Sequence, residues 1–423
     1  MGALTELIKM DMKPALGVTE PGAIAFAAAT ARQYVTGEIE HVRIALNSGM
    51  YKNAFTCGIP NCDETGNLYA AALGAVAGDA ALGLEALAHI DKADNKQARA
   101  LVEAGKIEVV LDHMGSEITI DAAVRTACDA CVVRIAGGHT DIYEISRNGE
   151  ILFQEKPHSV EKENKLGIHE FTFHDIICYV SEVEAGEIAF IKDAFSMNME
   201  LLEMGLSSKK TRFGPQLLRE NGGRLVSEDA LRSAQLMCNG AIEARVIGLS
   251  RPAMSITGSG AHGIIAVMPL FAWYQVHKDK ITEECLLRSA SLSYLVTMYI
   301  KEYSGKLSAF CGCGIAAGTG MACGLAYLRG AKEDQLGKVI QNMASGLTGM
   351  ICDGGNQGCV MKGITAVDAA FRAVDLALAD IYIEAKHGIN GATPEMTMRN
   401  MGRIASPGMV ETEREIVDIM RKK

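Results

Sequence analysis

Sequence that favours β-strands is concentrated in one stretch of this chain, residues 107–156. After about residue 166, Ala, Leu and Met are frequent and Pro is scarce, which is typical of helices. This division predicts an α+β fold: a smaller α/β domain with a short mixed sheet, followed by a larger, mostly helical domain. Four strand-like runs are separated by turn residues: Ile107–Leu111, Ile118–Ile120, Cys131–Ile135 and Asp141–Ile145.

The residues before that stretch predict helices and one more strand. Thr19 and Glu20 precede Pro21, which suits a first helical turn, so residues 1–40 are predicted to be helical. Period-two alternation over 41–46 predicts a strand. An Ala/Leu-rich helix is expected over roughly 68–90.

The length of 423 residues is enough for two or three domains with ample core. A charged run, Glu161–Lys165, is interpreted as a solvated connector. The predicted domains are therefore residues 1–165, an N-terminal helix plus the sheet-containing domain, and residues 166–423, the all-helical domain.

Charge and cysteine content limit the partners. With 41 Lys+Arg against 51 Asp+Glu the formal charge is −10, so the positive field that nucleic acid or an anionic membrane attracts is missing. The 12 cysteines lack the dense spacing of a secreted scaffold, which favours a reducing cytoplasm. Abundant apolar helix surface is compatible with a homo-oligomer.

One uncharged segment, Leu307–Leu328, is long enough to span a bilayer. It is rich in Gly, Ala and Cys and poor in the large apolar side chains that make insertion favourable, so a membrane span is not expected. Small residues recur four apart at Gly314/Gly318 and Gly320/Gly324, which lets helices approach closely.

Four cysteines lie in or beside uncharged, glycine-rich segments: Cys311, Cys313, Cys352 and Cys359. Thiolates hold iron–sulfur clusters, and glycines let backbone N–H groups approach the cluster sulfurs. Two buried thiols on a packed loop would explain the C-x6-C pair equally well, because this spacing is not a standard signature. We expect the glycine-rich loops 258–263, 312–320 and 354–358 to meet at the centre of the helical domain.

The other cysteines carry a weaker signal. Cys128 and Cys131 form a lone C-x-x-C in strand-like surroundings, without a second pair. Free cysteines are often buried, so the scattered ones are interpreted as core residues: Cys57, Cys62, Cys178, Cys238 and Cys285.

Five blocks in order resemble the iron–sulfur L-cysteine desulfidase family, a relative of the iron–sulfur L-serine dehydratase alpha chain. The resemblance covers nearly the whole chain. The blocks are Pro14–Pro21, Lys52-Asn53 with Gly58-Ile59-Pro60, Gly258-Ser259-Gly260, Ser308–Cys313 and Asp353–Cys359.

The resemblance implies a [4Fe–4S] cluster held by Cys311, Cys352 and Cys359, with Cys313 as a substitute for Cys311. The fourth iron would be open and act as a Lewis acid. The implied reaction is β-elimination from a small L-amino acid, first L-cysteine and second L-serine, giving pyruvate and ammonia. The helical domain would then be the cluster-binding, catalytic one.

The chain departs from the family at two places. Val18 stands where desulfidases usually carry a cysteine, and valine can neither ligate iron nor move a proton. His262 stands where the family more often has an Asn-Gln pair, and it is a candidate base because imidazole titrates near neutral pH. A satisfied histidine in a packed loop is the alternative.

The remaining candidates are polar residues of the same blocks. Lys52 and Asn53 could hold the substrate carboxylate, although a solvated loop lysine is an equal alternative. Ser259 could donate to the same carboxylate or cap a helix. Thr19 and Glu20 could line the site as catalytic residues, or serve only as helix-start residues.

Two other functions fit parts of the sequence. Gly258-x-Gly260-x-x-Gly263 with Asp279 imitates a dinucleotide fingerprint, but it lacks a preceding buried strand within a βαβ unit. A non-catalytic cluster-binding protein or inactive relative is the third hypothesis, and Val18 supports it.

Overall fold

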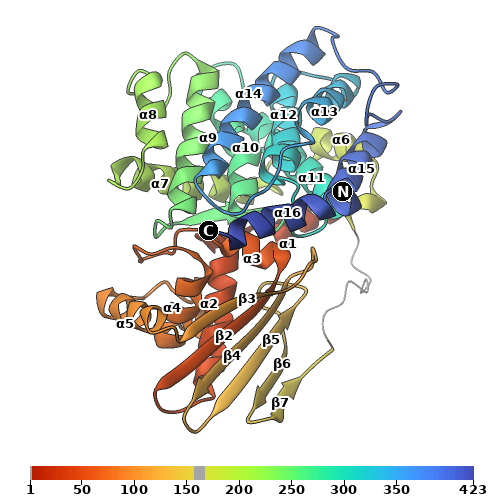
Figure 1. Ribbon diagram of the computed structural model, residues 1–423. Helices are drawn as coiled ribbons and strands as arrows, with labels where there is room; N and C mark the ends of the chain where they lie inside the picture. Colours follow the sequence, from red (N-terminus) through yellow and green to blue (C-terminus); the bar gives the residue numbers. More distant parts are fainter. Residues whose placement is uncertain (1, 157–166) are drawn as a thin grey trace.

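The computed structural model describes residues 2–156 and 167–423, and these residues form an α+β fold with two parts (Figure 1). Within the described residues, six strands form one mixed sheet in the order β3-β2-β4-β5-β6-β7. Strands β2 and β3 are parallel and the other neighbours are antiparallel. The strands are β2 (Ile39–Asn47), β3 (Ile107–His113), β4 (Thr119–Thr126), β5 (Ala130–Ala136), β6 (Ile142–Arg147) and β7 (Glu150–Gln154).

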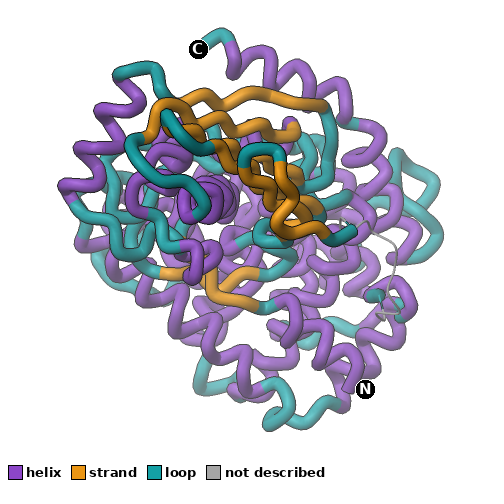
Figure 2. The backbone as a smooth tube through the Cα atoms, turned by 90° about the horizontal axis from the view of Figure 1, so that it is seen from below, coloured by secondary structure: helices purple, strands orange, loops and turns teal. Residues whose placement is uncertain are grey.

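One face of this sheet is covered by helices of the same part of the chain. Ile120 and Val124 of β4 and Val133 of β5 alternate inward and are fully buried. Helix α2 packs on strands β4 and β5. The parallel β2–β3 pair is joined by a helical crossover, as parallel strands require (Figures 1 and 2). The helices are α2 (Thr19–Gln33), α3 (Ser48–Ala54), α4 (Gly66–Ala77) and α5 (Lys92–Glu103).

Two helix predictions for this part of the chain are wrong in extent. Residues 1–40 contain a strand, β1 (Lys13–Leu16), between α1 (Gly2–Asp11) and α2, and Gly17 at φ +65° separates β1 from α2. The helix expected to reach residue 90 ends at Ala77. Asp79 then accepts a hydrogen bond from the Ala81 N–H and starts a 3₁₀ turn.

The second part is a bundle whose central helices are buried on nearly all sides. In α9, all residues from Ser233 to Val246 are buried, as expected for helices in the interior of a large bundle. The helices are α6 (Phe173–Glu182), α7 (Lys192–Ser207), α8 (Phe213–Glu220), α9 (Ala230–Val246), α10 (Gly260–Val276), α11 (Glu283–Ser304), α12 (Gly318–Leu328), α13 (Glu333–Leu347), α14 (Gly358–Leu378), α15 (Pro394–Arg403) and α16 (Val410–Arg421).

Both ends of the chain cross between the two parts. Strand β1 pairs antiparallel with β8 (Pro252–Ser255), and Leu4 and Ile8 of α1 belong to the core of the bundle. At the other end α16 packs against α3 (Figure 1). The domain ranges 1–165 and 166–423 stay a prediction, and the connector Glu161–Lys165 lies outside the described residues.

The uncharged segment 307–328 is not one continuous helix. A single π-helical turn, Cys313–Ala317, runs into α12, which packs closely on α11. A Cβ at Gly320 would lie 2.3 Å from both Ser293 O and Thr297 Oγ1. In the described part of the chain, no helix is long and apolar enough to cross a membrane.

Replacing Gly320 with Ala should therefore destabilise the protein, because a methyl group cannot fit against the backbone of α11. We expect a loss of about 1–3 kcal/mol in the free energy of unfolding, measured by denaturant titration. Gly346 of α13 is the matched control, since a Cβ there would meet nothing within 4 Å. Gly346→Ala should stabilise by about 0.5–1 kcal/mol. Equal effects of the two substitutions would contradict the close α11–α12 contact.

Candidate active site

The two cysteine-bearing segments lie against each other. The Cys311 N–H donates to Met350 O at 3.0 Å, and the Cys352 N–H donates to Ala309 O at 2.6 Å. Cys359 follows in the first turn of α14. Two segments about 40 residues apart in the sequence are thereby held together by backbone hydrogen bonds.

The three glycine-rich segments do meet, but at the face that the bundle turns to the α/β part. The predictions that all three are loops and that they meet at the centre of the helical domain are therefore wrong in part. Gly260 begins α10, residues 313–317 form the π-helical turn, and Gly358 begins α14. The glycines allow this contact: a Cβ at Gly312 would lie 2.6 Å from His262 Nε2, and one at Gly355 would lie 3.0 Å from Val18 Cγ1.

The four thiols influence one another. Cys311 is only 3% exposed, and the other three are partly exposed. A hydrogen bond from the Cys313 side chain lowers the pKa of Cys311 to about 7 and raises the pKa of Cys313. Burial raises the pKa of Cys359 to about 11 and also raises the pKa of Cys352. Thiols this close cannot all ionise unless a positive centre binds them.

The donor set suits a cluster better than a single ion. Among the described residues no group of three His, Cys, Asp or Glu side chains could hold one metal ion. A [4Fe–4S] cluster spreads its thiolates over different irons, so it needs sulfurs farther apart than a single ion does. Four thiols with glycine N–H groups nearby, such as the Gly314 N–H at 3.4 Å from Cys311 Sγ, are the types of donor that such a cluster takes.

Lysines supply positive charge around the thiols. Lys362 pairs with Asp353. Buried Lys301 donates to the carbonyls of Gly305 and Lys306, and burial lowers the pKa of its ammonium group. In the described structure Lys301 has no carboxylate partner within 4 Å. An anionic, thiolate-bound group would compensate this charge.

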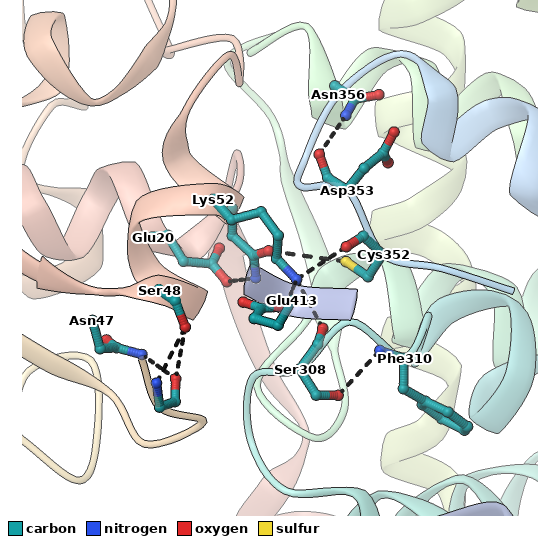
Figure 3. A network of polar contacts seen from close by, with 12 residues as sticks. Glu20, Asn47, Ser48, Lys52, Ser308, Phe310, Cys352, Asp353, Asn356 and Glu413 are labelled. Atoms are coloured by element: carbon teal, nitrogen blue, oxygen red, sulfur yellow. Dashed lines mark hydrogen bonds and ion pairs between the residues drawn. The ribbon is translucent and has the colours of Figure 1, made fainter. Parts of the chain in front are cut away.

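Lys52 connects both cysteine segments to the α/β part (Figure 3). It lies in α3 and is fully buried. Its Nζ donates to Ser308 O at 2.9 Å, Cys352 O at 3.0 Å and Glu413 Oε2 at 2.7 Å. All three ammonium hydrogens are used. Lys52 is therefore a buried lysine that links α3 to both cysteine segments and to α16, and it is not a solvated loop lysine. Its predicted contact with substrate stays a prediction.

The N-terminus of α2 contributes a second polar group. Thr19 Oγ1 donates to Glu20 Oε2 at 3.0 Å, and Asn53 Nδ2 donates to Glu20 Oε1 at 2.8 Å. The residue preceding the helix is Val18, so neither Thr19 nor Glu20 caps it with a side chain. Ser259, before α10, makes no capping hydrogen bond either. The side chains of Thr19, Glu20 and Ser259 therefore do not serve as helix caps.

His262 has one ring nitrogen fixed by a neighbour. Its Nδ1 lies 2.6 Å from Thr257 Oγ1, and the Thr257 hydroxyl donates to Ile256 O. Nε2 faces Gly312. A Thr257 hydroxyl that donates to Ile256 O would accept a hydrogen bond from Nδ1–H and leave Nε2 with its lone pair. Burial, with the charges of Lys301 and Arg245, holds the pKa of His262 well below its ordinary value. This lowered pKa favours the neutral form of the imidazole.

We call the place where the cysteine-bearing segments meet α2 and α3 the junction. Two residues of this junction are not predicted from the sequence to be functional. Cys57 was interpreted as core, and it is fully buried, but a Cβ at Gly355 would touch both its Sγ at 3.2 Å and Val18. A thiol, whose Sγ donates to Asn53 O at 2.7 Å, therefore lies close to Val18. The other is Arg245, at the end of α9. No local pattern marks either residue.

The dinucleotide-like glycines lie in a different context from a nucleotide fold. The strand before them, β8, belongs to a two-stranded antiparallel sheet with β1. Within the residues that the structure describes, no βαβ unit surrounds the motif, as the fingerprint requires.

The fold and the junction together define an α+β protein. In it, two cysteine-bearing segments of a helical bundle meet where the bundle contacts the α/β part. A family model described as the serine dehydratase alpha chain matches residues 81–418. The chain therefore belongs to the serine dehydratase alpha chain family.

Full-length relatives agree with this assignment. A UPF0597 protein of Clostridium botulinum (strain Langeland) is 40% identical, with 99% of this chain and 98% of the relative covered. UPF0597 proteins of Caldanaerobacter subterraneus and Clostridioides difficile are 36% and 34% identical over 99% and 98% of this chain, and 98% of each relative is covered. These relatives also span Val18 and Lys52, which lie before the family-model match.

Proposed function

We propose that this protein is a lyase that catalyses β-elimination from a small L-amino acid, with L-cysteine as the first candidate substrate and L-serine as the second. The observation that carries the proposal is the hydrogen-bonded pairing of segments 309–311 and 350–352, which gathers four thiols in a serine dehydratase alpha chain relative. With L-cysteine the products would be hydrogen sulfide, ammonia and pyruvate.

Cys311, Cys352 and Cys359 would hold a [4Fe–4S] cluster, with Cys313 as the alternative to Cys311. When bound, a cluster with an open iron supplies a Lewis acid for the departing sulfide or hydroxide. The chain's part is to keep the thiolates, Lys301 and the glycine N–H groups fixed around it. Because such a cluster is sensitive to oxygen, a reducing cytoplasm is the expected compartment.

His262 is the proposed base that takes the α-proton, through Nε2. An Nδ1–H donated to Thr257 Oγ1 would leave Nε2 free for this role. Glu20, which is 6% exposed and held by Thr19 and Asn53, is proposed to carry protons for later steps, while Asn53 and Ser259 orient the substrate. The elimination releases sulfide and leaves an enamine, and water converts the enamine to pyruvate and ammonia.

His262→Asn should lower kcat for pyruvate release by about 10²–10⁴ and change KM little, because a positioned base contributes mainly to the transition state. Iron content should match wild type, which separates loss of the base from loss of the cluster. His277→Asn, at the other end of α10, is the control and should retain wild-type kcat. A kcat for His262→Asn within about threefold of wild type would exclude His262 as the base.

The experiment that tests the function is pyruvate release by anaerobically prepared protein from L-cysteine and from L-serine. Higher kcat/KM on cysteine supports a desulfidase, and higher kcat/KM on serine supports a dehydratase. Val18 favours the one remaining candidate, a non-catalytic cluster-binding relative. That candidate would displace the lyase if fully loaded protein released pyruvate from neither substrate.

A further inference from the structure

Arg245 is a buried guanidinium without a charge partner. It is the last residue but one of α9, and only 4% of its surface is exposed. Its Nε–H has no hydrogen-bond acceptor, and no ion pair within the described residues includes it. A buried charge in that state costs several kcal/mol, so it is expected where a ligand supplies the opposite charge.

Arg245 lies at the junction already described. The Val246 carbonyl accepts from the Gly58 N–H at 2.9 Å, which fixes the end of α9 against the segment that carries Cys57. A Cβ at Gly260 would lie 2.7 Å from Arg245 Nε and 3.2 Å from its Cδ. The guanidinium therefore lies directly against the first residue of α10, two residues before His262.

Two helix N-termini meet beside this guanidinium. Helices α2 and α10 both begin without a side-chain cap. Thr19 Oγ1 lies 3.5 Å from Gly258 O, so the two helix starts are neighbours. Free N–H groups and the helix dipoles favour an anion at this place, and a guanidinium adds a planar fork that matches a carboxylate.

We propose that Arg245, with the N–H groups at the start of α10, binds the α-carboxylate of the substrate. This inference rests on the proposed function for the identity of the ligand. Under this inference Arg245 makes the main contact with the carboxylate in place of Lys52. The three ammonium hydrogens of Lys52 are already donated to protein oxygens. With the carboxylate at Arg245, the α-carbon would lie on the side of His262.

The test is calorimetric titration of cluster-loaded protein with L-alanine, which has the carboxylate and amine but no β-leaving group. Arg245→Met keeps the length of the side chain and should weaken L-alanine binding by about 10- to 100-fold, the loss expected for charged hydrogen bonds. The L-alanine affinity of Arg245→Lys should lie between those of wild type and Arg245→Met, because lysine keeps the positive charge but lacks the planar guanidinium. Arg251→Met, at an exposed arginine in the loop that follows α9, should bind L-alanine as wild type does.

Thermal unfolding without ligand gives a second readout. Arg245→Met should have a Tm equal to or above wild type, because it removes an unpaired buried charge. L-alanine should raise the Tm of wild type but not of this variant. A marked fall in Tm of ligand-free Arg245→Met would overturn the inference, because it would show that Arg245 has a structural partner.

Failure of this inference and of the proposed function can be told apart. If wild type releases pyruvate while Arg245→Met keeps its KM and its L-alanine affinity, only the role of Arg245 is overturned. If wild type releases no pyruvate but binds L-alanine through Arg245, the carboxylate site stands and the lyase does not. Absence of L-alanine binding by wild type overturns the inference.

Discussion

Replacing either Cys352 or Cys359 with Ala is expected to remove the cluster and all pyruvate release together. Cys352 lies in the segment that pairs with residues 309–311, and Cys359 follows in the first turn of α14. A cluster held by three protein ligands does not tolerate the loss of one. The measurements are iron and acid-labile sulfide per chain, the visible absorbance of the cluster, and kcat on L-cysteine, all under anaerobic conditions.

Cys128→Ser is the matched control for this pair, because Cys128 is an exposed thiol between β4 and β5. It should keep full iron content and activity. Comparison of Cys311→Ala with Cys313→Ala identifies the third ligand, since only the ligand's replacement should remove iron. Full iron content in both Cys352→Ala and Cys359→Ala would refute the ligand assignment.

Lys52→Met should destabilise the protein by about 3–5 kcal/mol, the usual result of removing one partner from a buried ion pair. Lys52 is fully buried, and the side chain of its partner Glu413 is 8% exposed. The substitution leaves a buried carboxylate without its cation and two carbonyls, those of Ser308 and Cys352, without a donor. The measurement is the free energy of unfolding from denaturant titration.

Two further variants make this prediction specific. The Lys192–Glu283 pair has the same 2.7 Å separation, but its side chains are 48% and 57% exposed, so Lys192→Met should cost no more than about 1 kcal/mol. The double variant Lys52→Met/Glu413→Leu should recover part of the loss, because no lone charge remains. A loss in the free energy of unfolding for Lys52→Met as small as that for Lys192→Met would contradict a stabilising role for the buried hydrogen bonds of Lys52.

The division into a sheet part and a helical part could be predicted from sequence because it depends on local pattern. The runs in 107–156 have the period and β-branched content of strands, and they correspond to β3, β4, β5 and β6. Strand β1 is not predicted because its pairing partner is distant in the sequence: Lys13 pairs with Ser255. Four residues between two helices carry no pattern of their own.

Some residues of the candidate site could likewise be predicted from the sequence, and others could not. The thiols and His262 stand out because glycines surround them, and the resemblance to a known family adds their roles. Glu413 and Arg245 do not stand out. Glu413 lies in a charged run that is typical of a solvated helix face, and Arg245 is the last residue but one of an ordinary helix. Only the packing of α16 against α3, and of α9 against the Cys57 segment, reveals them.

The most direct test of the account is the iron and acid-labile sulfide content of strictly anaerobic wild-type protein, followed by pyruvate release from L-cysteine and L-serine. The account predicts about four irons and four sulfides per chain, together with turnover of at least one of the two amino acids. Folded protein that takes up no iron and sulfide, yet releases pyruvate, would contradict the account.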